Sequence, residues 1–220
     1  MKQKIAIIGG SGDLGSGLAL RWARAGYPVV IGSRTAEKAV AAADDIRTKL
    51  PTAEVQGMDN LAAAEAGEIV VLTVPFANHA DTLDLVEDAV QGKILVDVTV
   101  PLVPPKVSRV QMPEGGSAGK RAQDQLGENV RVVSAFQNVA AAHLADLDHD
   151  PACDILVAGN VVAAREQVIE LVEACGMKGW HVGPIDNSAV AEALTSALIF
   201  MNKKYKIPGA GIRITGEPGA

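Results

Sequence analysis

The sequence feature that most constrains the fold is a glycine-rich loop between an apolar run and an amphipathic helix. Residues 10–15 read Gly-Ser-Gly-Asp-Leu-Gly, a GxGxxG pattern that follows the apolar run KIAIIG at residues 4–9. After the loop, Leu14, Leu18 and Trp22 recur at the spacing of one helix face. A strand, a glycine loop and a helix in this order form the first unit of a sheet that binds a dinucleotide. This context favours a nucleotide-binding loop over a glycine turn that binds nothing.

Each glycine of the loop has an expected physical role. Gly10 is predicted to make the tight turn, Gly12 to let the backbone approach a pyrophosphate, and Gly15 to let the helix pack closely on the strand. The first amide groups of the helix and its dipole would stabilise the bound anion.

The end of the second predicted strand, residues 28–31, indicates which dinucleotide is bound. Proteins that bind NAD carry Asp or Glu at this point to accept hydrogen bonds from the ribose 2′-hydroxyl. Here the strand leads instead into Ser33 and Arg34, with Lys38 one helical turn later. A hydroxyl and two cations suit a 2′-phosphate, so the sequence predicts NADP(H) rather than NAD(H).

Strand and helix patterns keep alternating along the chain. Further apolar runs are typical of buried strands, and they lie at residues 68–74, 93–98, 130–135, 154–159 and 178–182. The alternation predicts an α/β fold, a Rossmann-type doubly wound parallel sheet with a small C-terminal helical or α+β extension. We expect an NADP-binding domain over residues 1–150 and a small C-terminal domain over residues 151–220. A final helix from about residue 186 to 205 has more apolar positions than a monomer needs.

Composition excludes several other classes of protein. Aromatic residues make up 3% of the chain and its net charge is −6, which argues against a base-stacking surface for nucleic acid. Cys153 and Cys175 show no CxxC spacing and are expected as buried thiols of a reducing compartment. No secretory signal and no apolar run of about 20 residues is present, so we expect a cytoplasmic protein without a membrane span.

Other polar clusters carry weaker signals. Asn78 and His79 are expected to be exposed at the start of a helix. The acidic cluster at residues 146–150 lacks the spacing of metal ligands. The loop at residues 115–120 fails the Walker pattern, because Glu114 stands where the first Gly belongs and Arg121 where Ser or Thr is needed. We predict no metal site and no essential catalytic side chain.

The chain resembles the NADPH-dependent reductases of coenzyme F420 in segments spread over its whole length. These enzymes pass a hydride between NADP(H) and F420, an 8-hydroxy-5-deazaflavin. The segments that carry the resemblance are IGGSGDLGSGLALRWARAG, GSRTAEK, TVP, DVTVPL, PEGGSAG, DNSAVAEALTSALI and the tail NKKYKIPGAGIRITG. The tail is the most specific of them, because many dinucleotide-binding proteins share the glycine loop.

The resemblance implies a site in two halves and a homodimer joined through the C-terminal helices. Together with the motifs above, it gives as expected cofactor-binding residues Gly10, Ser11, Gly12, Asp13, Leu14, Gly15, Ser33, Arg34, Lys38, Val74, Pro75, Val100 and Ala135. Of these, Ser11 to Leu14 would contact the pyrophosphate and Val74, Val100 and Ala135 the nicotinamide side. The expected deazaflavin-binding residues are Gln137, Ala210, Gly211 and Ile212.

Two other functions stay open at this point. At Phe76, Asn78 and Gln137 the chain differs from archaeal members of the family, and all three positions lie on the substrate side. One alternative is therefore an NADPH-dependent reductase of another acceptor, such as an imine, a flavin or a metal chelate. The other is a protein that senses NADP(H) without turning it over.

Overall fold

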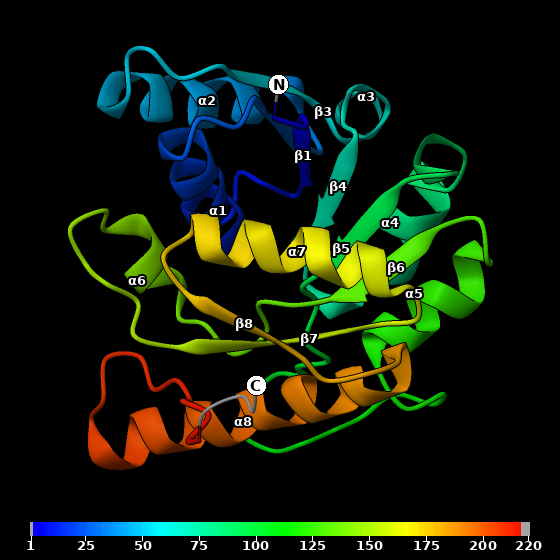
Figure 1. Ribbon diagram of the computed structural model, residues 1–220, viewed down its shortest axis with the longest axis vertical. Helices are drawn as coiled ribbons and strands as arrows, with labels where there is room; N and C mark the ends of the chain where they lie inside the picture. Colours follow the sequence, from blue (N-terminus) through cyan, green and yellow to red (C-terminus); the bar gives the residue numbers. More distant parts are fainter. Residues whose placement is uncertain (1, 217–220) are drawn as a thin grey trace.

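A computed structural model describes residues 2–216, and its strands form one eight-stranded sheet (Figure 1). The strands are β1 (Ile5–Ile8), β2 (Val29–Ser33), β3 (Val55–Asp59), β4 (Ile69–Leu72), β5 (Ile94–Asp97), β6 (Arg131–Ser134), β7 (Asp154–Gly159) and β8 (Lys178–His181). Their order is β3-β2-β1-β4-β5-β6-β7-β8. The first six strands repeat the order of a doubly wound dinucleotide-binding sheet, which confirms the predicted fold class.

One pair of strands departs from the expected parallel arrangement. β7 runs antiparallel to β6, with Ser134 opposite Ala158, whereas all the other neighbouring strands pair in parallel. The sheet is therefore mixed. It continues past residue 150 through β7 and β8, and the division into domains at that residue stays a prediction.

Helices cover both faces of the sheet (Figure 1). One face packs against α1 (Asp13–Arg24), α2 (Ala36–Lys49) and α7 (Val162–Ala174), and the other against α3 (Asn60–Ala66), α4 (His79–Val86) and α5 (Ala118–Leu126). Alternate strand residues point to opposite faces of the sheet: Ile5 and Ile7 pack in the hydrophobic core on the first face, and Ala6 and Ile8 in the core on the second. This double burial explains why the strands read as continuous apolar runs.

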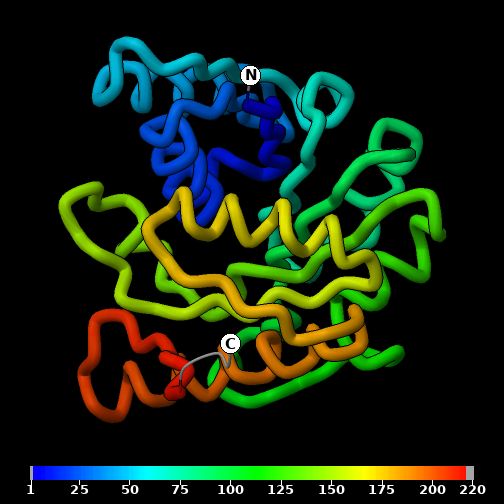
Figure 2. The backbone as a smooth tube through the Cα atoms, viewed as in Figure 1, coloured from blue at the N-terminus to red at the C-terminus, as the bar shows by residue number. Residues whose placement is uncertain are grey.

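Two further helices complete the fold. The short α6 (Ala141–Ala145) packs against α1, and α8 (Ser188–Tyr205) lies along one end of the molecule beside α5 and β7 (Figure 1). After α8 the chain folds back as a tail, residues 206–216, toward the start of β7 (Figure 2). There the backbone N–H of Asp154 donates to Ile212 O at 2.8 Å, and Ile214 N–H donates to Asp154 Oδ2 at 2.8 Å. Every helix in residues 2–216 is too short or too polar to span a bilayer.

The glycine loop follows β1, and its tight turn uses Gly9 as well as the predicted Gly10. The left-handed residue of the tight turn is Gly9, with φ +75°, while Gly10 closes the turn by donating to Ile7 O at 3.1 Å. A Cβ on Gly15 would lie 2.6 Å from the Cα of Gly10, so only glycine lets α1 approach this closely. A Cβ on Gly12 would meet only Gly9 O, at 3.5 Å, so this side of the loop is open.

Candidate functional site

A cleft of about 730 Å³ opens where β1, β2, β4 and β5 end. It crosses the point between β1 and β4 where the strand order reverses, the place where sheets of this type bind ligands. The residues that line it are Gly9, Ser11, Gly12, Asp13, Leu14, Ser33, Arg34, Thr35, Lys38, Asn60, Thr73, Val74, Pro75, Asn78, Val98, Thr99, Val100 and Leu102. Most of the predicted cofactor-binding residues thus share one cavity wall; Gly10, Gly15 and Ala135 do not line it.

The start of α1 presents unpaired backbone amides to the cleft. Its N-cap residue is Gly12, which has no side chain to accept hydrogen bonds from the first turn. Asp13 begins the helix, and its backbone N–H rather than its carboxylate suits an anion. The Ser11 hydroxyl donates to the Ser33 hydroxyl at 3.1 Å and ties the loop to β2. An open loop and free amides fit the pyrophosphate of a dinucleotide.

The end of β2 forms the positive part of the cleft. Arg34 and Lys38 are exposed, and neither makes a salt bridge with any residue from 2 to 216. α2 begins after Thr35, whose side chain makes no capping hydrogen bond, so the amides of this helix start are free as well. Two uncompensated cations beside free amides fit a phosphate group.

Two residues that were not predicted from the sequence hold the glycine loop against the neighbouring elements. Asn60 of α3 accepts a hydrogen bond from Gly9 N–H at 3.2 Å, and the Thr73 hydroxyl donates to Ile8 O at 2.9 Å. Thr73 directly follows β4, so its position at a strand end was a usable signal. Asn60 had none, because β3 and α3 were not predicted.

The predicted residues after β6 lie behind the cleft wall. Ala135 is fully buried, and Gln137 is 4% exposed. The Gln137 amide donates to Asp97 O at 2.8 Å and to Ser134 Oγ at 2.9 Å, so it braces β5 against β6. Phe136, which lies between Ala135 and Gln137 in the chain, has φ +70°, and this conformation turns the chain sharply after β6.

The predicted tail residues also lie outside the cleft lining. Ala210 N–H donates to Asn202 Oδ1 of α8 at 2.8 Å. A Cβ on Gly211 would lie 2.7 Å from Cys153 Sγ, so the tail packs closely on the start of β7. Because β7 runs antiparallel to β6, its start lies at the same edge of the sheet as the cleft. The assignment of this tail and of Gln137 to a second ligand stays a prediction.

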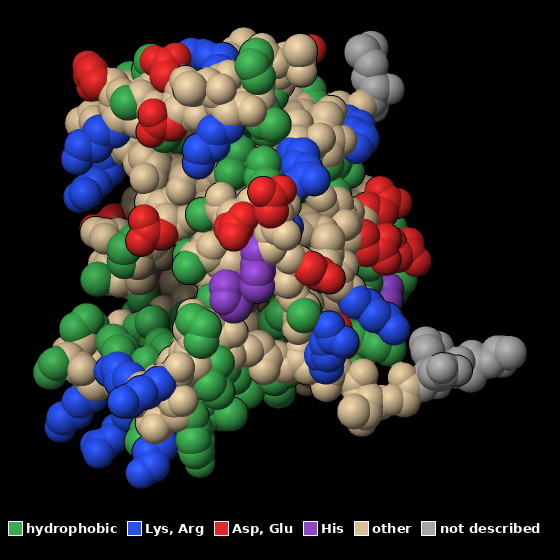
Figure 3. All heavy atoms as spheres, turned by 90° about the vertical axis from the view of Figure 1, so that its left-hand side faces the viewer, with side chains coloured by type: hydrophobic (Ala, Val, Ile, Leu, Met, Phe, Trp, Pro, Cys, Tyr) green, Lys and Arg blue, Asp and Glu red, His purple; other side chains and the backbone are tan. Residues whose placement is uncertain are grey.

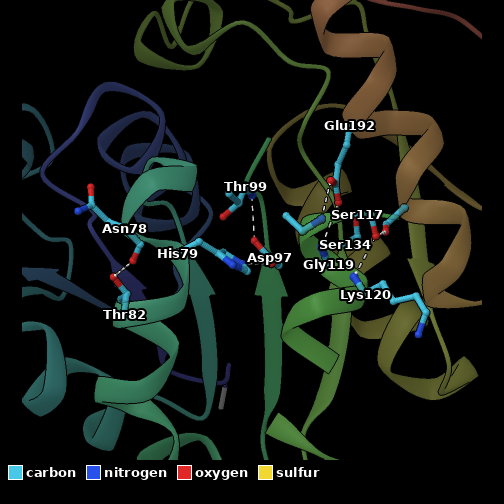
Figure 4. A network of polar contacts seen from close by, with 12 residues as sticks. Asn78, His79, Thr82, Asp97, Thr99, Ser117, Gly119, Lys120, Ser134 and Glu192 are labelled. Atoms are coloured by element: carbon cyan, nitrogen blue, oxygen red, sulfur yellow. Dashed lines mark hydrogen bonds and ion pairs between the residues drawn. The ribbon is translucent and has the colours of Figure 1, made fainter. Parts of the chain in front are cut away.

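The expected exposure of His79 is wrong. His79 is 2% exposed, and its Nε2 lies 2.7 Å from Oδ2 of Asp97, which is fully buried (Figure 4). The other carboxylate oxygen of Asp97 accepts a hydrogen bond from Thr99 N–H at 2.9 Å. The pair therefore fastens α4 to the end of β5 and fixes the chain as it enters the cleft wall. Asn78, by contrast, is exposed as expected.

A second buried acid joins α8 to α5. Both carboxylate oxygens of Glu192 accept hydrogen bonds at the start of α5, from Ala118 N–H at 2.7 Å and Gly119 N–H at 3.0 Å (Figure 4). Burial raises the pKa of Glu192 to about 7, although the two amides lower it. Since Glu192 occupies this helix start, the positive end of α5 is already paired.

No group of three or more His, Cys, Asp or Glu side chains within residues 2–216 is arranged to hold a metal ion. The cleft itself has exposed cations at one end and an apolar wall of Val74, Val98 and Val100 at the other, a lining that suits an extended anionic nucleotide.

Comparisons with known proteins agree with this geometry. Residues 4–101 match the family model described as NADP oxidoreductase coenzyme F420-dependent. The F420-dependent NADP reductase of Methanocaldococcus jannaschii is 42% identical, over 96% of this chain and 98% of that protein. The enzyme of the same name from Methanothermobacter marburgensis is 40% identical, over 98% of this chain and 99% of that protein. A solved structure from Arthrobacter sp. FB24 covers 97% of this chain and 100% of its own, with 26% identity and a TM-score of 0.79.

Proposed function

Because the chain belongs to the family of coenzyme F420-dependent NADP oxidoreductases, we propose that it transfers a hydride between NADP(H) and the deazaflavin coenzyme F420. The observation that carries the proposal is the cleft at the switch point of the sheet, which has cationic residues at one end and an apolar wall at the other. Full-length similarity to two enzymes of this name supports the same reading.

The residues that line the cleft indicate how the nucleotide would be bound. The backbone amides of Ser11, Asp13 and Leu14 would hold the pyrophosphate. Gly12 would contribute by having no side chain in the way, since its own N–H already donates to Gly9 O at 3.1 Å. Ser33, Arg34 and Lys38 would hold the 2′-phosphate. The absence of an acid at the end of β2 removes the group that would repel that phosphate and favour NAD(H).

The nicotinamide half would lie toward β4 and β5, against Val74, Pro75 and Val100. When both coenzymes are bound, their two rings supply the redox chemistry and exchange the hydride directly. The protein's part is to orient the rings and to exclude water from between them. Direct hydride transfer of this kind needs no nucleophile and no general base from the chain.

The deazaflavin half would involve Gln137 and the tail residues Ala210, Gly211 and Ile212. The support for this placement is that the tail is fixed at the start of β7, on the edge of the sheet where β6 ends. The tail is also where the resemblance to the family is most specific.

We also propose that the protein is a cytoplasmic homodimer joined through α8. The side chains of this helix include large apolar residues that are open to solvent, at 59% for Val190, 56% for Phe200 and 66% for Tyr205. Figure 3 shows hydrophobic side chains gathered at the lower end of the molecule, where α8 and the tail lie, with Lys and Arg side chains around them. Burying such a face against a second copy removes apolar surface from water.

The direct test of the proposed activity mixes the protein, NADPH and purified coenzyme F420. Loss of the visible absorption band of the oxidised deazaflavin supports the proposal. If NADPH binds but the band persists, the acceptor is another molecule. If NADPH does not bind, the nucleotide assignment itself is wrong.

A further inference from the structure

A buried hydroxyl group without a partner lies on the wall of the cleft. Thr99 is 2% exposed, and its Oγ1 makes no hydrogen bond with any described residue. The residue lines the cleft between Val98 and Val100. A buried hydroxyl that has lost its water and gained no partner costs free energy, so such a group in a binding site calls for a ligand.

The backbone of Thr99 is fixed from behind. Its N–H donates to Oδ1 of Asp97 at 2.9 Å, and Oδ2 of Asp97 lies 2.7 Å from Nε2 of His79. Figure 4 shows the side chain of Thr99 turned away from the carboxylate that holds its backbone. A β-branched residue has few side-chain rotamers, so a fixed backbone also restricts the hydroxyl. The hydroxyl oxygen itself has almost no accessible surface, so a ligand reaches it only once the wall of the cleft opens slightly around Thr99.

The position of Thr99 selects which part of a dinucleotide it can reach. Arg34 and Lys38 follow β2, on one side of the switch point, and Thr99 follows β5, on the other side. A dinucleotide with its 2′-phosphate at β2 and its pyrophosphate at the glycine loop carries its nicotinamide toward β4 and β5. The surroundings of Thr99 there are apolar, with Val74, Val98 and Val100 in the same wall.

We propose that the Thr99 hydroxyl hydrogen-bonds the carboxamide of the nicotinamide ring and fixes the orientation of that ring. The inference rests on the proposed function, because it needs NADP(H) in the cleft. A hydroxyl both donates and accepts, and a carboxamide offers both an oxygen and an NH₂ group. The ring can otherwise rotate about its bond to the ribose, and hydride transfer requires one face and one position of the ring toward the acceptor.

The test compares two ligands and two substitutions by isothermal titration calorimetry. The ligands are NADP⁺ and adenosine 2′,5′-bisphosphate, which keeps the 2′-phosphate but lacks the nicotinamide. Thr99→Val removes the hydroxyl and keeps the shape of the side chain, while Thr99→Ser keeps the hydroxyl. We expect Thr99→Val to weaken NADP⁺ binding by roughly three- to tenfold, the value of one neutral hydrogen bond, with the bisphosphate unaffected. Thr99→Ser should bind both ligands like the unaltered protein.

Each other outcome overturns the inference. If Thr99→Val binds NADP⁺ as tightly as the unaltered protein, the hydroxyl does not contact the ligand. If both ligands lose affinity equally, the hydroxyl supports the shape of the cleft instead. If Thr99→Ser loses as much as Thr99→Val, the hydroxyl is not the cause. If the unaltered protein binds neither ligand, the proposed function falls together with the inference; in the first three cases the proposed function stands.

Discussion

At the scale of single residues, we expect two cations to decide which nucleotide the cleft accepts. Arg34 presents a planar guanidinium that can bind two phosphate oxygens, and Lys38 adds a point charge one turn later. Both are unpaired with any described acid, so their positive potential is available to a ligand. A chain with net charge −6 can therefore bind a polyanion at this point.

Replacing Arg34 by Ala should change the choice of nucleotide. We expect the affinity for NADPH to fall by roughly 10- to 100-fold, the value of a charge-assisted hydrogen bond or two, and the affinity for NADH to change little. Fluorescence titration with both nucleotides measures the two effects. Lys49→Ala is the matched control, because it removes a cation from the far end of the same helix, α2. Equal losses for NADPH and NADH would contradict the 2′-phosphate assignment.

Glu192 should make the stability of the protein depend on pH. Burial raises its pKa to about 7 in the folded protein, above the ordinary 4.5. The folded state therefore holds the proton more tightly than the unfolded state, and this contribution is complete at low pH and is lost as pH rises toward 7. The loss amounts to roughly 3 kcal/mol.

Glu192→Gln should remove this pH dependence. Urea unfolding between pH 4.5 and 8 should show the free energy of unfolding of the unaltered protein falling relative to that of Glu192→Gln as pH rises. Glu166→Gln, at an exposed position on α7, should run parallel to the unaltered protein. If the curve of Glu192→Gln also ran parallel to that of the unaltered protein, burial would not raise the pKa of this carboxyl.

At the scale of elements, the sequence predicted those strands and helices that are set by a local apolar pattern or by glycine residues. The unit from β1 to α1 could be predicted because a strand buried on both faces reads as a continuous apolar run, and the helix after it has one apolar face. β3 could not, because only Val55 of its five residues is buried. The direction of β7 could not be read either, since the apolar pattern of a strand is the same in both directions.

Of the residues that line the cleft, the predicted ones lie in short local motifs or, like Val74, Pro75 and Val100, close behind a strand. The glycine loop and the start of α2 are local motifs. The pair of His79 and Asp97 joins two elements 18 residues apart in the sequence, and its one local signal was an acid at the end of the apolar run ILVD. The burial of Gln137 depends on β5 and β6 being neighbours, which no short motif expresses.

The tail is the element whose role can be tested by deletion. Its contacts with Asp154 and Cys153 place it on the start of β7, away from the glycine loop. Removing residues 208–220 should therefore abolish reduction of the deazaflavin and leave NADPH affinity unchanged. Spectroscopic assays of the first and titration of the second measure both. Retained deazaflavin reduction would show that the tail is not part of the second binding site.

At the scale of the whole molecule, the exposed face of α8 should join two copies. Light scattering should give twice the 22.8 kDa of one chain. The double substitution Phe200→Glu and Tyr205→Glu should give a monomer, because two carboxylates cannot be buried in an apolar interface without a partner. Leu85→Glu is the control, since Leu85 is 50% exposed but lies on α4. An unaltered mass in the double variant would place the interface elsewhere or exclude a dimer.

The fold, the cleft and the family together indicate that this molecule brings two ring systems together for direct hydride transfer. The most direct measurement uses NADPH carrying deuterium at the transferable position of the nicotinamide, followed by mass spectrometry of the reduced coenzyme F420. Both prochiral labels are tested. We expect one of the two labelled forms to deliver one deuterium to the deazaflavin ring. Reduction without deuterium from either form, or no reduction while NADPH binds, would contradict it.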